Sequence, residues 1–299
     1  MTQSPTQSIR ALRRADEPDI RHILTTSDYI HYRFSPDELP RLLDTSPTVG
    51  LFSAPVGRLA RLSQPTLVAF LLANEIAAPV GWIGGFGVTW GEGSRYIECL
   101  DLLLPPLTQA LIAHGVSSLY YSGSDLDTDW LRDPLEARGF RLVSLLRSYD
   151  KIDYAIPSHG NQQARVRLFT PADIPQLVEI DRLCFAALWR HDGPAFLEIA
   201  STYPYFVVAE DEQGIAGYQF NIVDATTGYL VRIAVHPRAQ GKGIGMRLMA
   251  EAVRYFRRKD VSRIILNTEE ENTRAQRLYE YFGFFVTHAR GFALGRELE

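Results

Sequence analysis

A glycine-rich segment has the most evident capacity for chemistry in this sequence. Glycines occupy positions 241, 243 and 245, shortly after the apolar run 229–235, and Arg238 and Lys242 add positive charge. Glycine allows positive φ angles, and successive backbone N–H groups at the start of a helix bind phosphate oxygens. The segment therefore predicts an anion site for a phosphorylated ligand.

The spacing of these glycines excludes two other phosphate-binding loops. A P-loop requires Ser or Thr after its Gly-Lys pair, but Lys242 is followed by Gly243. The dinucleotide-binding fingerprint places its third glycine three positions after the second, whereas Gly245 follows after two. A plain tight turn is the remaining alternative, and the flanking strand, the basic residues and the helix that follows disfavour it.

A second pattern begins at Asn272, which is a good helix N-cap. Ala275, Leu278 and Tyr279 then fall on one helical face, so Tyr279 is either a core aromatic or a polar group directed at a ligand. The reference pKa of tyrosine, about 10, exceeds that of a thiol, about 8.5. Tyr279 is therefore suited to hydrogen-bond donation to a thiolate rather than to complete proton transfer.

Together the two patterns resemble the GNAT superfamily of N-acetyltransferases. Arg238-x-x-Gly241-x-Gly243 is similar to its acetyl-CoA signature, and Asn272-x-x-Ala275-x-x-x-Tyr279 is similar to its second cofactor motif. The resemblance covers residues 165–298 and implies acetyl-CoA as co-substrate. It implies that the glycine loop holds the pyrophosphate. It also implies that strand 233–235 pairs with the pantetheine amides and splays from strand 261–267.

The same resemblance assigns the site residues. It implies that Tyr279 is the catalytic residue that meets the departing thiolate. The acetyl-CoA-binding residues that it implies are Ile233, Ala234, Val235, Arg238, Gly241, Lys242, Gly243, Ile244, Gly245, Met246 and Asn272. No set of metal ligands is indicated, so we expect no metal.

The general base is less well defined. Within the superfamily, the second half most resembles ribosomal-protein alanine N-acetyltransferases, which have a glutamate where this sequence has Asn267. Glu269 is the best candidate base nearby, although a solvated acidic turn is the favoured interpretation of residues 269–271. A protein α-amine has a pKa of about 7.7–8.0, against about 10.4 for lysine, and so depends less on a base.

Several side chains have two interpretations each. The residues that either line the acceptor side or only pack are Trp189, Arg190, His191, Arg232 and Tyr205. Cys184 lies on an apolar helical stripe, which favours a buried structural thiol. His236 precedes Pro237 and is expected to be a turn residue rather than a base.

Hydrophobic periodicity predicts an α+β domain around a mixed sheet in the second half. The expected helices are 174–184, 243–259 and one capped by Asn272; the expected strands are 205–210, 215–223, 229–235, 261–267 and a final pair within 284–298. The first two strands should form a hairpin. The third should lead into the glycine loop.

The two halves of the sequence repeat one another. Residues 12–20 parallel residues 169–177, and residues 135–140 parallel residues 279–284. Residues 154–164 are rich in Pro, Ser, Gly, Asn and Gln, as a linker is. We therefore expect two tandem GNAT-like domains, each a mixed, mostly antiparallel sheet flanked by helices, over residues 1–155 and 163–299.

The first copy is expected to be degenerate. The prediction places its counterpart of the glycine loop at residues 100–109, where Pro105 and Pro106 remove N–H donors and no glycine occurs. Leu135 aligns with Tyr279 and cannot donate a hydrogen bond. We expect this domain to keep the fold without binding acetyl-CoA and to pack against the second domain.

Composition limits the classes of partner. The net charge of −4, from 31 Lys and Arg against 35 Asp and Glu, favours neither nucleic acid nor a membrane surface. Two cysteines without zinc spacing, and no signal peptide or transmembrane run, lead us to expect a cytoplasmic protein. A monomer with pseudo-dimeric tandem domains and a homodimer are both compatible with the repeat.

The leading hypothesis is acetyl transfer from acetyl-CoA to a primary amine by direct attack in a ternary complex, with a protein N-terminal α-amine as one acceptor. An alternative is a small-molecule amine: an amino acid derivative, a polyamine, an aminoglycoside or a substrate like that of mycothiol synthases, which the tandem arrangement also resembles. A third hypothesis is a non-catalytic acetyl-CoA-binding module.

Overall fold

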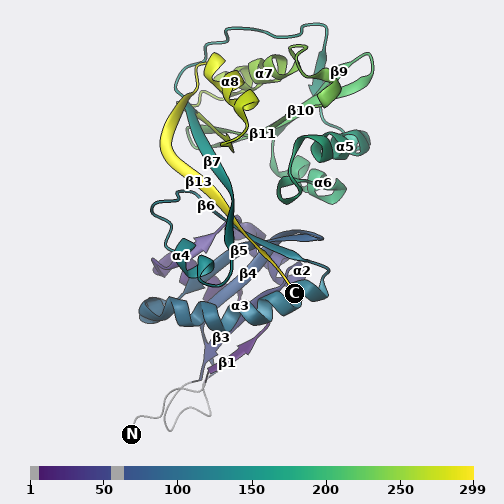
Figure 1. The fold of residues 1–299 in the computed structure, drawn as a ribbon. Helices are drawn as coiled ribbons and strands as arrows, with labels where there is room; N and C mark the ends of the chain where they lie inside the picture. Colours follow the sequence, from purple (N-terminus) through teal and green to yellow (C-terminus); the bar gives the residue numbers. More distant parts are fainter. Residues whose placement is uncertain (1–6, 55–63) are drawn as a thin grey trace. The chain divides into compact units, whose positions relative to one another are not determined.

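The computed structural model describes residues 7–54 and 64–299, which fall into two compact units (Figure 1). Unit 1 contains the described residues up to Ser122, then Trp130–Arg141 and Leu294–Glu299. Unit 2 contains Gly123–Asp129 and Leu142–Ala293. Residues 1–6 of the first expected domain lie outside the described residues.

Unit 1 is built on a mixed sheet with the order β1-β3-β4-β5-β6, and β2 pairs with β5. The β5–β6 pair is parallel, whereas the β1–β3, β3–β4, β4–β5 and β2–β5 pairs are antiparallel. Its elements are β1 (Gln7–Arg10), η1 (Arg14–Asp16), α1 (Glu17–Thr26), β2 (Ile30–Tyr32), η2 (Pro36–Glu38), α2 (Leu39–Thr45), β3 (Thr48–Ser53), β4 (Thr66–Ala77), β5 (Val80–Val88), η3 (Trp90–Arg95), α3 (Tyr96–Ala113), β6 (Ser118–Gly123) and α4 (Arg132–Glu136).

Unit 2 has a sheet of the order β7-β12-β11-β10-β9-β8, with β13 beside β7. Only the β11–β12 pair is parallel among the registered pairs of this unit. Its elements are β7 (Arg141–Lys151), β8 (Arg165–Leu168), η4 (Pro171–Asp173), α5 (Ile174–Cys184), η5 (Ala187–Trp189), α6 (Gly193–Thr202), β9 (Tyr205–Asp211), β10 (Gly214–Asp224), β11 (Thr227–Val235), η6 (Pro237–Ala239), α7 (Ile244–Arg258), β12 (Arg263–Glu269), α8 (Thr273–Tyr281) and β13 (Phe285–Glu297).

The structure confirms the predicted helices and the strands up to β12 in unit 2, with bounds shifted by at most two residues. The predicted pair of strands at the end is wrong. Residues 285–297 form a single strand, β13, because Gly291 continues the extended backbone instead of turning it. The antiparallel partner of β12 is β7, which comes from the first half of the sequence.

The two compact units differ from a division of the chain between residues 155 and 163. Strand β7 precedes that point and belongs to unit 2 from Leu142 onward. Strand β13 follows it, yet its end from Leu294 belongs to unit 1, where Leu298 N donates to Ser117 O at 2.8 Å. Each unit therefore completes its sheet with chain from the other half of the sequence.

The expected linker packs along helix α7 of unit 2. Tyr154 Oη donates to Val261 O near the end of the helix, and His159 Nδ1 lies 2.7 Å from Arg254 Nη2. Asn161 N donates to Gly243 O at 3.1 Å at the start of the helix. The linker thus follows α7 along its length, antiparallel to it.

In unit 1, the predicted position of the degenerate loop is wrong. Pro105 and Pro106 lie inside α3, which begins at Tyr96. The connection between β5 and α3 is instead Thr89 and η3, which contains Gly91 and Gly93. A Cβ at Gly93 would lie 2.7 Å from the Tyr29 ring, so this loop is covered by an aromatic side chain. Leu135 is buried in α4, as its apolar side chain favours.

Helix α3 also has the length and composition of a membrane span, the one such case among residues 7–54 and 64–299. It packs on β3, β4 and β5 through a buried face that includes Leu100, Leu103 and Leu107 (Figure 1). Core helices of globular domains meet the same criterion, so this observation by itself is weak evidence for a membrane span.

Candidate active site

The site is organised by an opening between two parallel strands of unit 2. Strands β11 and β12 pair only at their beginnings, from Thr227 with Arg263 to Tyr229 with Ile265. Beyond this point β11 stays paired with β10 as far as Val235, and β12 stays paired with β7 as far as Glu269. The facing edges of the two strands therefore separate, as expected. We call this gap the β11–β12 opening.

The edge of β11 presents peptide groups to this opening. His236 N donates to Ala216 O, and antiparallel pairs alternate between bonded and non-bonded residues. Ile233 and Val235, which alternate with the bonded residues, consequently direct their peptide groups away from β10. Val235 O accepts from Cys184 Sγ at 3.3 Å and from Gln240 Nε2 at 3.0 Å.

The glycine loop opens helix α7 with free N–H groups. Gly241 and Gly243 have φ angles of 78° and 81°, which glycine adopts without strain. Arg247 N, the first donor that the helix itself satisfies, bonds to Gly243 O at 3.0 Å. The N–H groups from Gly241 to Met246 precede it and have no such acceptor within the helix, which is the arrangement of an anion cradle.

The two positive-φ glycines of the loop have different surroundings. A Cβ at Gly241 would meet no atom within 4 Å, so this side of the loop is open. A Cβ at Gly243 would lie 3.1 Å from Asn161 N of the linker. The open side of the cradle is therefore at Gly241. Of the other predicted loop residues, Ile244 is buried in the core, whereas Lys242 is exposed.

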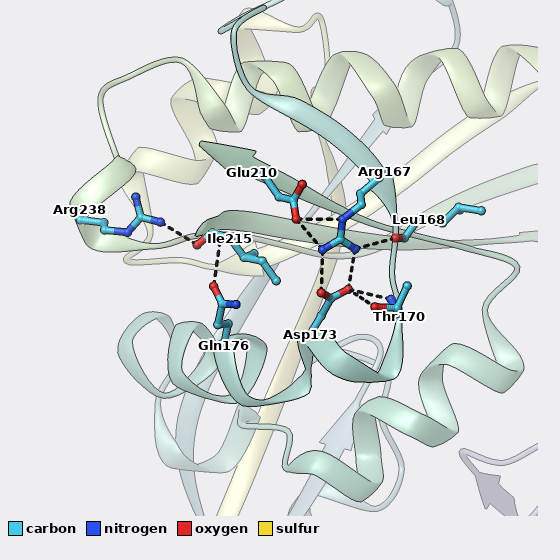
Figure 2. A network of polar contacts seen from close by, with 8 residues as sticks. All are labelled: Arg167, Leu168, Thr170, Asp173, Gln176, Glu210, Ile215 and Arg238. Carbon is cyan, nitrogen blue, oxygen red and sulfur yellow. Dashed lines mark hydrogen bonds and ion pairs between the residues drawn. The ribbon is translucent and has the colours of Figure 1, made fainter. Parts of the chain in front are cut away.

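Arg238 is held by the β9–β10 hairpin. Its guanidinium donates to Asp211 Oδ2 at 2.6 Å and, as Figure 2 shows, to Ile215 O at 3.0 Å. This ion pair lowers the pKa of the Asp211 carboxyl. Arg238 thus fixes the loop to the hairpin.

Tyr279 is buried between strand β7 and the turn that follows helix α8. Its ring forms an edge contact with Tyr149, with 5.7 Å between centroids, and lies 6.2 Å from the ring of Phe284. Burial, with a smaller contribution from the charge of Glu269, raises the pKa of Tyr279 above its ordinary value. The phenol therefore stays protonated near neutral pH and remains a hydrogen-bond donor.

The second motif is organised as the sequence predicts at its start. Asn272 Oδ1 accepts from Ala275 N at 3.2 Å, so Asn272 is the N-cap of α8. A contact that sequence analysis missed joins this helix to the glycine loop: Arg274 Nη1 donates to Gln240 Oε1. Because Gln240 also holds Val235 O, the start of α8, the loop and the end of β11 are connected.

The three glutamates at the end of β12 and in the turn after it have different roles. Glu270 is engaged by Arg147 at 3.0 Å and by Arg290 at 3.7 Å, so its carboxylate is structural. Glu271 and Asn267 are exposed. Glu269 accepts from Thr268 Oγ1 at 3.3 Å and is near enough to Tyr279 to influence its pKa. Of the three glutamates of this turn, Glu269 is thus the one whose charge contributes to the raised pKa of Tyr279.

A buried polar cluster, which we call the Asp181 cluster, lies on the face of β11 that helix α5 covers. It consists of Asp181, Tyr218 and Arg232; Asp181 Oδ1 accepts from Tyr218 Oη and, at 2.6 Å, from Arg232 Nη1. Asp181 is fully buried, and the Arg232 side chain is 10% exposed. Sequence analysis missed Asp181, although an acidic residue beside Leu177 and Ile180 on the buried face of a helix is an unusual signal.

The cluster holds the segment 185–191. Arg232 Nη2 donates to Trp189 O, its guanidinium lies 4.0 Å from the centre of the Phe185 ring, and His191 N donates to Asp181 Oδ2 at 2.6 Å. Burial lowers the pKa of His191 to about 3, with the charge of Arg232 adding to the effect, so the imidazole is neutral near pH 7.

The remaining predicted candidates lie elsewhere or pack. Tyr205 is on the α7 face of the sheet, where its ring stacks on Tyr255 at 4.2 Å. Burial raises the pKa of Cys184 to about 11, which suits a structural thiol rather than a nucleophile. His236 Nδ1 accepts from Arg238 N within the turn, as a turn residue does. Within the described part of the chain, no three His, Cys, Asp or Glu side chains gather as metal ligands would.

Comparison with known proteins agrees with this geometry. Residues 174–284, which run from the start of α5 through the opening and the glycine loop to just beyond the end of α8, match the model of the acetyltransferase (GNAT) family. This part of the chain is a GNAT acetyltransferase domain.

Relatives of the GNAT domain carry acetyltransferase names. A Bacillus subtilis (strain 168) protein named as a ribosomal protein bS18-alanine N-acetyltransferase is 29% identical over 121 residues, which are 40% of this chain and 80% of that protein. A mycothiol acetyltransferase of Acidimicrobium ferrooxidans is 28% identical over 177 residues, 52% of this chain. That match spans 56% of the relative, little more than half of its length.

The tandem architecture also has a solved counterpart. A tandem GNAT protein from the clavulanic acid biosynthesis pathway superposes with a TM-score of 0.65 at 13% identity, over 98% of this chain and 99% of its own. At this identity the similarity concerns the fold. It confirms the α+β, tandem GNAT architecture expected from the repeat.

Proposed function

We propose that this chain is an N-acetyltransferase that binds acetyl-CoA in the β11–β12 opening and transfers the acetyl group to a primary amine by direct attack in a ternary complex. The observation that carries the proposal is the opening itself. Peptide groups of Ile233 and Val235 that face away from β10 line it, and it leads to the free N–H groups of the glycine loop.

The residues present fit acetyl-CoA. Pantetheine carries amides that pair with a free strand edge, and the pyrophosphate needs several N–H donors at one point. The edge at Ile233 and Val235 supplies the first requirement, and the open side of the loop at Gly241 supplies the second. When bound, acetyl-CoA supplies an activated thioester carbonyl.

Two side chains of the protein then donate a hydrogen bond or accept a proton. Tyr279 holds its proton because its pKa is raised, and it donates a hydrogen bond to the sulfur that takes up negative charge. Glu269 is the candidate that accepts the amine proton, directly or through water. The turn is exposed enough for a water relay, since Glu271 and Asn267 reach solvent.

We propose a protein N-terminal α-amine as the acceptor. An α-amine is partly neutral near pH 8, whereas a lysine amine costs roughly 3.5 kcal/mol more to deprotonate, so a site with one weakly placed carboxylate suits the former. The name of the Bacillus subtilis relative supports the same acceptor class. The tandem fold and the mycothiol acetyltransferase relative favour a second candidate, a small-molecule amine.

Calorimetric titration of the full chain with acetyl-CoA tests the proposal. We expect one site per chain, because only unit 2 has an open glycine loop beside a free strand edge among the described residues. Acetylation of an Ala-starting peptide is then compared with that of its N-terminally blocked form and with a panel of small amines. No binding would refute the proposal, and two sites would refute the expected silence of unit 1.

A further inference from the structure

Unit 1 fills its own counterpart of the β11–β12 opening. Strands β5 and β6 pair in parallel only from Val80 with Ser118 to Trp82 with Tyr120, so they separate as β11 and β12 do. Strand β2 then pairs with β5 along Gly85 to Gly87, on the edge opposite β4. A segment of the chain therefore takes the strand edge that stays unpaired in unit 2.

The corresponding segment of unit 2 has another conformation. Counted from the helix starts Glu17 and Ile174, β2 corresponds to Ala187–Trp189. These residues form the 3₁₀ turn η5, in which Trp189 N donates to Ala186 O at 2.9 Å. The turn makes no strand pair with β11. One position in the repeat thus closes the opening in unit 1 and leaves it free in unit 2.

The Asp181 cluster accounts for this difference. Arg232 holds the carbonyl of Trp189 and the ring of Phe185, and Asp181 holds the amide of His191, so both ends of the segment are fixed to α5 and β11. Fixing both ends keeps the segment on the α5 face of the sheet and away from the free edge at Ile233 and Val235.

Among the described residues of unit 1, the cluster has no polar counterpart. By strand register, Tyr218 corresponds to Phe70 and Arg232 to Gly85, and by helix position Asp181 corresponds to Leu24. A Cβ at Gly85 would lie 2.9 Å from the Phe34 ring and 3.3 Å from Phe70. Apolar rings therefore occupy the space around Gly85 on that strand.

Another ion pair of unit 2, unlike the Asp181 cluster, has a counterpart in unit 1. Arg167 donates to Asp173 at 2.7 Å and to Glu210 at 2.6 Å (Figure 2). Unit 1 has the same Arg–Asp pair, because Arg10 donates to Asp16 at 2.7 Å. An ion pair common to both units serves the fold that they share, whereas the Asp181 cluster belongs to the unit with the free opening.

We propose that the Asp181 cluster is a set of positioning residues that keeps segment 185–191 out of the β11–β12 opening and thereby keeps the acetyl-CoA site accessible. This inference rests on the proposed function. Without the cluster, pairing of residues 187–189 with the free edge of β11 competes with the ligand. Apparent affinity then falls in proportion to the fraction of chains that remain open.

The test installs the unit 1 residues in unit 2. The variant Asp181→Leu/Tyr218→Phe/Arg232→Gly removes both charges together, so that no buried ion is left unpaired. We expect acetyl-CoA affinity to fall by about tenfold or more. We also expect the amides of residues 187–189 to gain protection in hydrogen exchange, because strand pairing protects them. Unchanged affinity and unchanged exchange would overturn the proposal.

A matched control is Arg167→Met/Asp173→Leu, which removes the ion pair that both units share. It should lower the melting temperature without adding protection at residues 187–189 and with acetyl-CoA affinity within about twofold of the wild type. An equal loss of affinity in the control would also overturn the proposal.

Exchange in the unaltered, ligand-free protein decides the matter if the triple variant does not fold. The structure requires Leu188 N to exchange rapidly there and Leu230 N, within β11, to exchange slowly. Strand-like protection of Leu188 would overturn the proposal. If the wild type fails to bind acetyl-CoA, the proposed function fails, whereas the exchange data still report where the segment lies.

Discussion

The phenol of Tyr279 is a donor because its surroundings disfavour the phenolate. Burial against Tyr149 and Phe284 removes water, and the nearby negative charge of Glu269 acts in the same direction, so the pKa of Tyr279 is raised. Because tyrosine is a weaker acid than a thiol, it stabilises a thiolate through a hydrogen bond in which the proton stays on the phenol oxygen. The proton therefore need not leave the tyrosine during acetyl transfer.

Replacement of Tyr279 by Phe removes that hydrogen bond and keeps the ring. A hydrogen bond to a charged group contributes about 1.5–3 kcal/mol, so kcat should fall about ten- to a hundredfold, with the KM for acetyl-CoA nearly unchanged. Steady-state kinetics measure both. Tyr149→Phe is the control, since it keeps the ring that contacts Tyr279 and should leave kcat unchanged. An unchanged kcat in Tyr279→Phe would remove this residue from the mechanism.

The open side of the glycine loop gives a second residue-level prediction. Gly241→Ala places a methyl group where nothing lies within 4 Å, and it should weaken acetyl-CoA binding by at least about tenfold because the methyl group enters the cradle. Gly115→Ala is matched for backbone strain, with a φ of 79° against 78° at Gly241. Calorimetry should show reduced affinity for Gly241→Ala alone; equal affinities would exclude Gly241 from the cradle.

The site residues differ in whether a short sequence motif is enough to predict their positions. Asn272, Tyr279 and the loop glycines occupy short motifs, so the sequence places them correctly on their elements. Asp181 and Tyr149 are different, because their roles arise from contacts with residues far away along the chain. Arg238 lies where the motif predicts, but its charge is used by Asp211, a pairing that depends on the hairpin register.

At the scale of elements, β2 is a short strand that places a histidine in a dry environment. His31 Nε2 is buried without a partner, and Nδ1 lies 3.5 Å from Tyr121 Oη. Burial, with a smaller contribution from the charge of Arg33, lowers the pKa of His31 to about 4. The folded chain therefore holds this imidazole neutral over a pH range in which the unfolded chain protonates it.

This difference in the pKa of His31 between the folded and the unfolded chain predicts that acid lowers the stability of the protein. Between pH 6.5 and about 4 the unfolded state binds the extra proton, so the free energy of unfolding falls as pH is lowered through this window. At pH 5 the loss attributable to His31 should be up to about 2 kcal/mol. Urea unfolding at pH 7 and pH 5 measures it, and His31→Gln should reduce the pH dependence by that amount. Identical pH dependence in the two proteins would contradict a neutral, buried His31.

Element boundaries were predictable where the pattern was strong. The amphipathic period of α7 and the N-caps of α5 and α8 give their bounds from the sequence alone. The run of leucines before Pro105 gave a false loop, because two prolines suggest a break, whereas α3 continues through them. The pairing of β2 with β5 was not predictable, since three residues carry too little pattern to specify a partner.

At the scale of the molecule, strands β7 and β13 make each unit depend on both halves of the sequence. Lys151, at the end of β7, is fully buried and donates to Phe282 O at 2.7 Å, at the end of α8. Tyr149 on the same strand packs against Tyr279. The GNAT domain therefore uses side chains that precede the matched region 174–284.

A fragment of residues 163–299 should consequently fail to fold, although it contains both cofactor motifs. It lacks β7, which pairs with β12 from Ile264 to Glu269, and it leaves the buried faces of Tyr279 and Phe282 uncovered. A fragment of residues 142–299 restores β7 and should show cooperative thermal unfolding by circular dichroism. Equal stability of the two fragments would contradict a structural role for β7.

The course of β13 has a consequence for synthesis of the chain. Ser118 on β6 bonds to Glu297, which lies 179 residues later, and Leu298 N bonds to Ser117 O. While the ribosome translates the intervening residues, β6 has an unsatisfied edge, and unpaired edges invite association with other chains. The first half of the chain must therefore wait for nearly all of the second before its sheet is complete, and its exposure to chaperones is set by translation time.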